Sequence, residues 1–245
     1  MYTNGYIFRY AGIMVIIAAA LLSTAAMLLK PFQERNVAID KMEGILASAQ
    51  IPGVTAQNAI QLFNEDVTEE IVINENGEAV ETYTEPHKEN AKAFNIDMKA
   101  ELYKKSQGKP FELPLYVIEK NGQKLYVIPV RGTGLWGPIW GNVALASDLN
   151  TIVGVTFDHK GETPGLGAEI STKAFEDQFV NKTIFDNQGN FTSIMVVKGG
   201  IGKLPENDRI HGVDAISGGT ITSNGVNDML KDVLESYLPY IKKHR

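Results

Sequence analysis

Leu115-Tyr-Val-Ile118 and Leu125-Tyr-Val-Ile-Pro-Val130 are two apolar runs separated by Lys120-Asn-Gly-Gln123. Runs rich in β-branched and aromatic residues on either side of Asn-Gly are typical of a β-hairpin. The same pattern surrounds Asn76-Gly77 within residues 71–80, and a third pair of runs, 142–146 and 152–157, flanks Asp148-Leu-Asn150. Hairpins repeated along one chain predict a twisted, mainly antiparallel sheet.

Helical patterns surround these hairpins. Apolar residues recur at helical spacing over 34–50, and seven of them form one stripe near the C-terminal end: Val226, Met229, Leu230, Val233, Leu234, Tyr237 and Leu238. Shorter helices are expected at 57–63 and 173–179, and a further strand at 191–198. Residues 81–112 are polar, and both a helix-containing insertion and a loop are compatible with them. The pattern predicts an α+β fold with helices packed on the sheet.

One N-terminal segment has the composition of a membrane span. Residues 10–29 carry no charge and lie between Arg9 and Lys30. At ~1.5 Å rise per residue, this length matches the ~30 Å hydrocarbon core of a bilayer. A cleaved signal peptide is the alternative, but its apolar core would be shorter and its charged leader stronger. Basic residues flank both ends, so charge alone does not determine the orientation.

These boundaries divide the chain into four parts. We expect a short tail over 1–9, a transmembrane helix over 10–29, a juxtamembrane helix and linker over 30–56, and a globular domain over 57–245. The net charge of −6 disfavours a nucleic-acid partner. The absence of cysteine excludes disulfides and Cys-ligated zinc or iron–sulfur centres within the chain. The four histidines show no HExxH or HxH spacing, so no metal site is expected.

Three glycine-rich segments are candidate ligand loops. Residues 131–141 combine four glycines with Trp136 and Trp140, residues 159–167 carry Glu162 and Thr163, and residues 214–226 lead into the last helix. Taken singly, each also fits an ordinary structural role: tryptophans packed on the core, a connecting loop, or a helix cap formed by Thr222 or Ser223.

The third segment carries the strongest chemical signal. Asp214-Ala-Ile-Ser-Gly-Gly-Thr-Ile-Thr-Ser-Asn-Gly-Val226 holds four hydroxyl residues and three glycines, and it matches neither GxGxxG nor the Walker A pattern. Backbone N–H groups, hydroxyls and a helix N-terminus together suit a phosphate. Lys198, which precedes a glycine pair, is either a solvated charge or a cation held near an anionic ligand.

In order along nearly the whole chain, these motifs resemble the C subunit of the sodium-translocating NADH:quinone oxidoreductase, a relative of the G subunit of Rnf complexes. The matching segments are Asp40…Gly44-Ile-Leu, Gly134-Leu-Trp-Gly, Glu162-Thr-Pro-Gly-Leu-Gly, Val196-Val-Lys-Gly-Gly and His211-Gly-Val-Asp…Ser-Gly-Gly-Thr…Thr-Ser-Asn-Gly-Val. The Rnf-type subunit is therefore the nearest alternative. An anchored extracytoplasmic ligand-binding or sensor module without a redox role is the alternative from another class.

The resemblance implies a covalent FMN, joined by a phosphoester to Thr220, the last residue of the family's Ser-Gly-Ala-Thr type motif. Gly219 stands here where the family usually has Ala. Asp214 matches the motif acid that serves during attachment by a flavin transferase. Residues implied around the flavin and its tail are Trp136, Gly137, Glu162, Thr163, Leu166, Lys198, Ser217, Gly218, Gly219, Thr222 and Ser223.

The resemblance also implies a function. The domain over 57–245 would be an extracytoplasmic FMN-binding domain on the periplasmic side of the bacterial inner membrane, held by a single span. It would relay single electrons, received from an iron–sulfur centre in partner membrane subunits, to another covalent flavin. NADH oxidation, quinone reduction and sodium movement would belong to the partner subunits, so the chain would not be catalytic alone.

Overall fold

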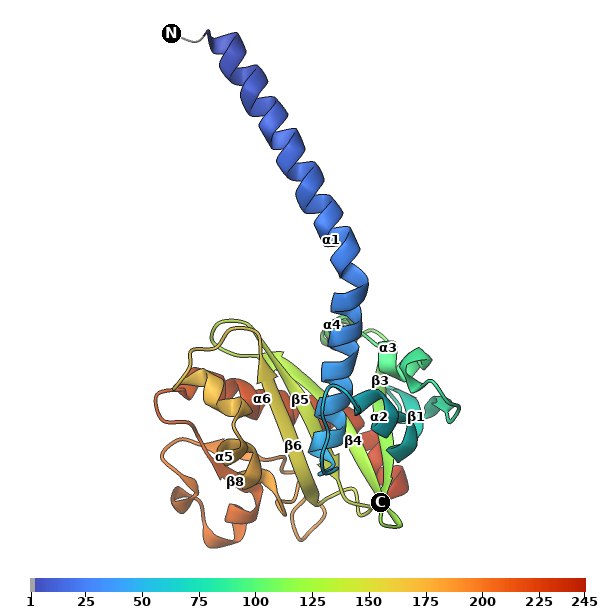
Figure 1. Ribbon diagram of the computed structural model, residues 1–245. Coiled ribbons are helices and arrows are strands. Elements are labelled where there is room, and N and C mark those ends of the chain that lie inside the picture. The colour runs from blue at the N-terminus through green and yellow to red at the C-terminus, as the bar shows by residue number, and fades with distance from the viewer. Residues whose placement is uncertain (1–2) are drawn as a thin grey trace. The chain divides into compact units, whose positions relative to one another are not determined.

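The computed structural model describes residues 3–245 and divides into two compact units, one ending at Lys41 and the other comprising Met42–Arg245 (Figure 1). Helix α1 (Asn4–Ser48) runs through both. In the described part of the chain, α1 is the one helix long and apolar enough to cross a membrane; its most apolar stretch has a mean hydropathy of 2.4 and is fully exposed. The two helices expected over 10–29 and 34–50 are parts of this one helix, which continues through Pro31.

A six-stranded antiparallel sheet organises the unit Met42–Arg245, and this confirms the predicted α+β fold with its antiparallel sheet. Its strands are β1 (Val67–Asn74), β2 (Ala79–Tyr83), β3 (Glu112–Lys120), β4 (Gln123–Thr133), β5 (Pro138–Leu145) and β6 (Ile152–His159), in the order β2-β1-β3-β4-β5-β6. The turn between β3 and β4 has left-handed backbone at Asn121 (φ 52°) and Gly122 (φ 75°), as a tight hairpin requires.

The predicted strand over 191–198 is much shorter in the structure. Only Met195–Val197 form a strand, β7, which pairs in parallel with β8 (Gly212–Asp214). Ser193 has a left-handed backbone with φ 58°, and this ends the extended run two residues before β7. The undecided segment 81–112 is the helix-containing alternative, with α3 (Lys92–Asn95) and α4 (Met98–Ser106).

Helices cover both faces of the sheet. Helix α6 (Thr220–His244) packs its apolar stripe against one face, where Ile128, Val130 and Val143 are buried. Alternate strand residues point to the other face, where Tyr116 contacts Phe63 of α2 (Ala59–Asp66) with ring centroids 6.0 Å apart. The end of α1 within this unit is also buried: Met42, Ile45, Leu46. Figure 1 shows α6 and α2 on opposite sides of the sheet.

Candidate functional site

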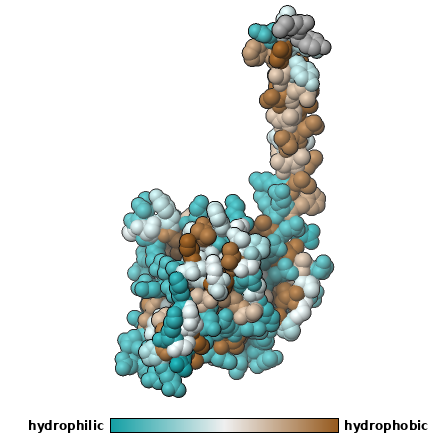
Figure 2. Space-filling view, turned by 90° about the vertical axis from the view of Figure 1, so that its left-hand side faces the viewer, coloured by the Kyte–Doolittle hydropathy of each residue, from teal (hydrophilic) through white to brown (hydrophobic). Residues whose placement is uncertain are grey.

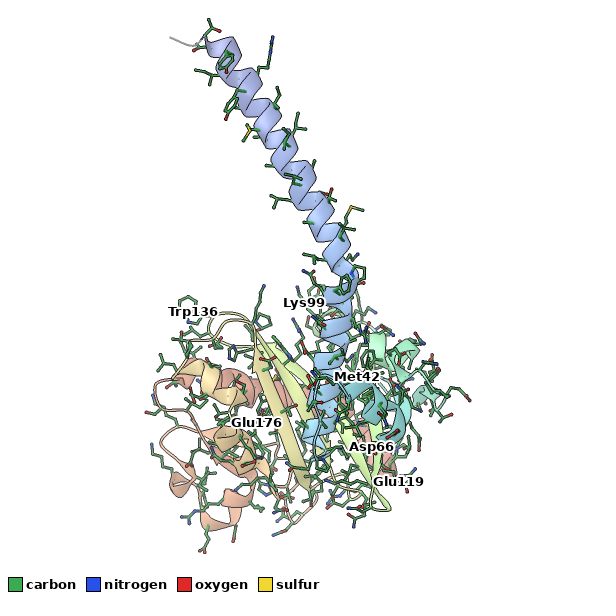
Figure 3. All side chains as sticks on the ribbon, viewed as in Figure 1. Met42, Asp66, Lys99, Glu119, Trp136 and Glu176 are labelled. Atoms are coloured by element: carbon green, nitrogen blue, oxygen red, sulfur yellow. The ribbon has the colours of Figure 1, made fainter. Side chains whose placement is uncertain are left out.

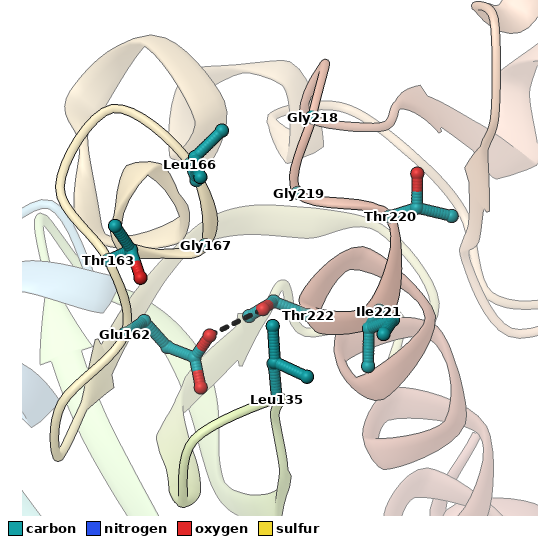
Figure 4. A pocket seen from close by; sticks show the side chains of 10 residues that line it. All are labelled: Leu135, Glu162, Thr163, Leu166, Gly167, Gly218, Gly219, Thr220, Ile221 and Thr222. Atoms are coloured by element: carbon teal, nitrogen blue, oxygen red, sulfur yellow. Dashed lines mark hydrogen bonds between the residues drawn. The ribbon is translucent and has the colours of Figure 1, made fainter.

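A pocket of about 230 Å³ lies where three loops meet near the ends of strands β4, β5 and β6 (Figure 4). The loops are the β4–β5 connection, the segment after β6, and the approach to α6. The lining residues are Leu135, Glu162, Thr163, Leu166, Gly167, Gly218, Gly219, Thr220, Ile221 and Thr222.

Strand register brings the first two loops together. Thr133 pairs with Pro138 at the end of the β4–β5 ladder, and Ile139 pairs with His159 at the end of β5–β6. The β4–β5 connection is closed by Gly134 N–H, which donates to the Gly137 carbonyl at 2.8 Å. A Cβ at Gly225 of α6 would collide with the Thr133 carbonyl oxygen, so α6 packs directly on this loop. The paired strand ends therefore position the β4–β5 loop and the loop after β6, and α6 closes the pocket beside them.

Glu162 lies at the floor of the pocket and is 4% exposed. Its Oε1 accepts a hydrogen bond from Trp136 N–H at 2.8 Å, and its Oε2 accepts one from the Thr222 hydroxyl at 2.6 Å. The Glu162 N–H donates to His159 Nδ1 at 3.2 Å. One carboxyl group thus joins all three segments of the site.

The four hydroxyl residues of the 214–226 segment have different environments. Thr222 is buried and donates to Glu162, while the buried Ser223 Oγ accepts the Ile216 N–H at 3.1 Å. Thr220 is half-buried at the pocket, and its side chain forms no hydrogen bond within residues 3–245. Ser217 is exposed and outside the lining. Figure 4 shows the Thr220 hydroxyl directed away from Glu162.

The start of α6 corrects one expectation from the sequence. The N-cap is Gly219, without a side-chain cap, so neither Thr222 nor Ser223 caps the helix. Both residues lie inside the first turn, because the helix begins at Thr220 rather than near Thr222. The first bond that closes the helix runs from Ser223 N–H to the Gly219 carbonyl, at 2.9 Å. The preceding N–H groups, beside Thr220, are the ones a helix leaves for an anion.

Two glycines shape the approach to α6. Gly218 has φ +76°, a conformation that other residues rarely adopt, and a Cβ there would lie 2.6 Å from Leu166 Cδ2. A Cβ at Gly219 would lie 3.0 Å from Ile216 Cγ2 and 3.2 Å from the Leu166 carbonyl oxygen. An Ala at 219 would therefore require its neighbours to shift by a few tenths of an ångström, and Gly219 avoids that contact.

Six residues of the predicted site do not line the pocket. Trp136 is 68% exposed beside the mouth and Gly137 follows it, while Ser217 and Ser223 belong to the third loop and α6. Lys198 is exposed after β7. Asp214 ends β8, where its Oδ1 accepts the Ile201 N–H at 2.7 Å. No cluster of three or more potential metal ligands occurs in the described residues.

Three lining residues were missing from the predicted site: Leu135, Gly167 and Ile221. Leu135 and Ile221 are 48% and 56% exposed, and with Leu166 at 42% they give the pocket an apolar rim. Figure 3 places Trp136 at the side of the domain that Figure 2 turns toward the viewer, and Figure 2 shows apolar atoms gathered there. The sequence offered a local signal for two of these residues. Leu135 lies within the Gly-Leu-Trp-Gly motif, and Ile221 lies between Thr220 and Thr222.

Comparisons with known proteins agree with this geometry. Residues 134–235 match the model of the FMN-binding domain family. The C subunit of the Na+-translocating NADH-quinone reductase from Pseudomonas aeruginosa is 30% identical, with 94% of this chain and 93% of that protein covered. The C subunit from Vibrio vulnificus is 33% identical, with coverage of 92% and 90%.

Solved structures give the same result. The crystal structure of the C subunit from Parabacteroides distasonis is 40% identical with a TM-score of 0.74, covering 87% of this chain and 96% of that one. NqrC of Shewanella oneidensis is 25% identical with a TM-score of 0.64, covering 84% and 98%. Fold and pocket thus define an FMN-binding domain. The chain belongs to the family of the C subunit of the Na+-translocating NADH-quinone reductase.

The residues of the pocket fit FMN. Its apolar rim suits a flavin ring, and its half-buried hydroxyl stands at a helix N-terminus suited to a phosphate. The volume of about 230 Å³ is below the ~300–1,000 Å³ typical of sites that enclose a whole ligand. A bound flavin would therefore extend beyond the pocket, and the exposed apolar rim would be available to it.

Proposed function

We propose that this chain is a membrane-anchored electron-transfer subunit of a Na+-translocating NADH:quinone oxidoreductase, with FMN joined to Thr220 through a phosphoester. The observation that carries the proposal is the environment of the hydroxyls in residues 214–226. Thr222 and Ser223 are buried and engaged in hydrogen bonds. Thr220, the first residue of α6, lines the pocket, and its hydroxyl has no hydrogen-bond partner among the described residues.

The protein's part in this function is to hold and tune the cofactor. When bound, FMN supplies one-electron chemistry, and the surrounding residues determine its position and potential. An ester at Thr220 keeps the flavin from dissociating. The positive end of α6 stabilises the remaining phosphate charge by ~0.3–1 kcal/mol where it is exposed. The exposed apolar side chains of Leu135, Leu166 and Ile221 would exclude water from the part of the flavin ring that they contact.

The remaining parts of the proposal concern location and partners. The domain lies on the periplasmic side of the inner membrane, and α1 holds it near the other subunits of the complex. Electrons arrive from an iron–sulfur centre of those subunits and leave to a second covalent flavin. A flavin transferase loads Thr220, and Asp214 is the motif acid that serves during this attachment. Trp136, Gly137 and Lys198 lie around the flavin and its tail.

Fluorescence after denaturation tests the attachment site. The full chain is produced with a flavin transferase, denatured and examined in a gel for flavin fluorescence. We expect a fluorescent band for the wild type and for Thr220→Ser, which keeps a hydroxyl, and a dark band for Thr220→Val. Thr84→Ala, which removes an exposed hydroxyl outside the three loops of the site, should remain fluorescent. A dark wild-type band would instead favour a sensor module, and fluorescence in Thr220→Val would reassign the anchor.

A further inference from the structure

The Glu162 carboxyl group lines the pocket, but it is already engaged in hydrogen bonds within the protein. Both of its oxygens accept hydrogen bonds from protein donors, at 2.8 Å from Trp136 N–H and 2.6 Å from the Thr222 hydroxyl. The side chain is 4% exposed, and Thr222 is 1% exposed. Hydrogen bonds shielded from water in this way are stronger than exposed ones. The carboxyl group is therefore a strong cross-link between the β4–β5 loop and α6.

Two glycines enclose this carboxyl group. A Cβ at Gly134 would lie 2.6 Å from Glu162 Oε1. A Cβ at Gly167 would collide with Glu162 Oε2 and lie 2.5 Å from the Thr222 hydroxyl oxygen. Each oxygen of Glu162 thus lies close to a glycine, and a methyl group at either position would require the carboxyl group to move. Such a movement would disturb the hydrogen bonds that the carboxyl group makes to Trp136 N–H and to Thr222 in the first turn of α6.

We propose that Glu162 is a positioning residue that fixes the direction in which Thr220 presents its hydroxyl for attachment of the flavin. Thr222 follows Thr220 by two residues in the first turn of α6, and two helical residues at this spacing point in nearly opposite directions. Holding Thr222 against Glu162 therefore turns Thr220 outward, as Figure 4 shows. This inference rests on the proposed function, because it concerns the residue that would receive the phosphoester.

The proposal gives Thr222 and Glu162 roles inside the protein instead of contacts with FMN. Attachment of a phosphoryl group requires the acceptor oxygen to be held in the reacting geometry, and misplacement by about 1 Å costs on the order of a hundredfold in rate. A first turn without its tie to Glu162 would sample other orientations of Thr220. The expected consequence is slower loading of a chain that still folds.

Glycine variants of one loop provide the first test. Gly167→Ala places a methyl group between Glu162 and Thr222, whereas Gly161→Ala in the same loop meets no atom within 4 Å. We expect Gly167→Ala to slow the initial rate of covalent flavin attachment by roughly tenfold, the order of magnitude expected for the loss of one hydrogen bond. Gly161→Ala should load at the wild-type rate. Thermal unfolding of the full-length variants establishes that both are folded.

Substitutions at Thr222 test the hydrogen bond itself. Thr222→Val keeps the shape but has no donor, so it should load as slowly as Gly167→Ala, while Thr222→Ser should restore the rate. Hydrogen–deuterium exchange of the flavin-free full-length chain supplies a readout independent of loading. Exchange of the peptide that contains Trp136 should be faster in Thr222→Val and Gly167→Ala than in Thr222→Ser and Gly161→Ala.

The outcomes separate this inference from the proposed function. A wild-type chain that stays dark with the transferase overturns covalent attachment, and the positioning role falls with it. A fluorescent wild type, with Gly167→Ala and Thr222→Val loading at its rate, overturns the positioning role alone. Thr222→Ser loading as slowly as Thr222→Val overturns it as well, because the hydroxyl would then not be what matters.

Discussion

Ser193 combines two unfavourable features in one residue. Its backbone is left-handed, with φ 58°, and its side chain is 2% exposed with no hydrogen-bond partner for Oγ among the described residues. A buried hydroxyl without a partner costs about 1–3 kcal/mol, and a left-handed backbone costs a non-glycine residue on the order of 1 kcal/mol more. Ser193 is therefore a position where the native residue lowers stability.

Ser193→Gly should stabilise the protein. Glycine removes both the unpaired hydroxyl and the backbone strain, and its greater freedom in the unfolded chain offsets part of the gain. We expect the free energy of unfolding to rise by about 1 kcal/mol, which corresponds to a few degrees in melting temperature. Thermal unfolding of the full chain in detergent measures this. Ser193→Ala, which removes only the hydroxyl, should give a smaller gain, and a lower melting temperature for Ser193→Gly would contradict the account.

The candidate site was only partly predictable at the residue scale. The segment 214–226 and the helix that follows it are local features, and from the sequence alone they indicated a phosphate site. The division of labour between Thr220 and Thr222 is not local, because it depends on Glu162, a residue 60 positions away from Thr222. Two residues of the apolar rim, Leu135 and Ile221, were missed for the same reason, since their exposure depends on the packing of three loops.

Among the short elements, α5 (Lys173–Glu176) carries a pH-sensitive contact to the sheet. Glu176 Oε1 accepts the Phe157 N–H of β6 at 2.7 Å, and burial raises the pKa of the Glu176 carboxyl group from 4.5 to about 7, although that hydrogen bond acts to lower it. Figure 3 shows Glu176 on its short helix beside the sheet. The folded protein therefore holds this proton more tightly than the unfolded chain does.

The sign of the pH effect follows from this raised pKa. Between pH 4.5 and about 7 the folded state binds more protons, so the contribution of Glu176 to stability is greatest below pH 4.5 and is lost as pH rises through 7. Because Glu176 is partly exposed, we expect a loss of only about 1 kcal/mol. Glu176→Gln retains an acceptor for Phe157 N–H and should remove this loss. Urea unfolding of both proteins at pH 5 and pH 8 measures it, and equal pH dependence in the two would contradict the assignment.

The C-terminal end of α1 belongs to the core of the folded domain. Leu46 is fully buried, whereas Leu22 in the apolar stretch of the same helix is 72% exposed. Leu46→Ala should lower the free energy of unfolding by about 2–5 kcal/mol, as large-to-small substitutions in cores do. Denaturant unfolding of the full chain in detergent tests this, with Leu22→Ala as the matched control that leaves the transition of the domain unchanged. Equal effects of the two substitutions would argue against the distinction.

Sequence patterns predicted these elements with unequal success, for physical reasons. The hairpins were predictable because Asn-Gly turns and alternating runs act over a few residues. Continuity of α1 was not, because a proline removes one N–H donor and usually ends a helix, and Pro31 does not end this one. The prediction of a strand over 191–198 was wrong at Ser193, which has a left-handed backbone. Serine as a residue type does not indicate this conformation.

At the scale of the whole molecule, one chain combines a helix suited to span a membrane with an FMN-binding domain. Fold class and family followed from the sequence because several motifs occur in a fixed order along almost the entire chain. Orientation in the membrane did not follow, because basic residues flank the apolar stretch on both sides. The proposed periplasmic position of the domain is therefore the property that most needs a direct test.

The absence of cysteine makes that test simple, because any introduced thiol is the only one in the chain. Asn187 is exposed in the folded domain, and Asn4 is exposed at the start of α1. If α1 spans the inner membrane with the domain in the periplasm, Asn187→Cys should react with a membrane-impermeant maleimide that is added to cells with permeabilised outer membranes. Asn4→Cys should react only after the inner membrane is disrupted, because it lies before the apolar stretch. Labelling of Asn4→Cys alone in cells with an intact inner membrane would place the domain in the cytoplasm, and labelling of both would argue against a spanning helix.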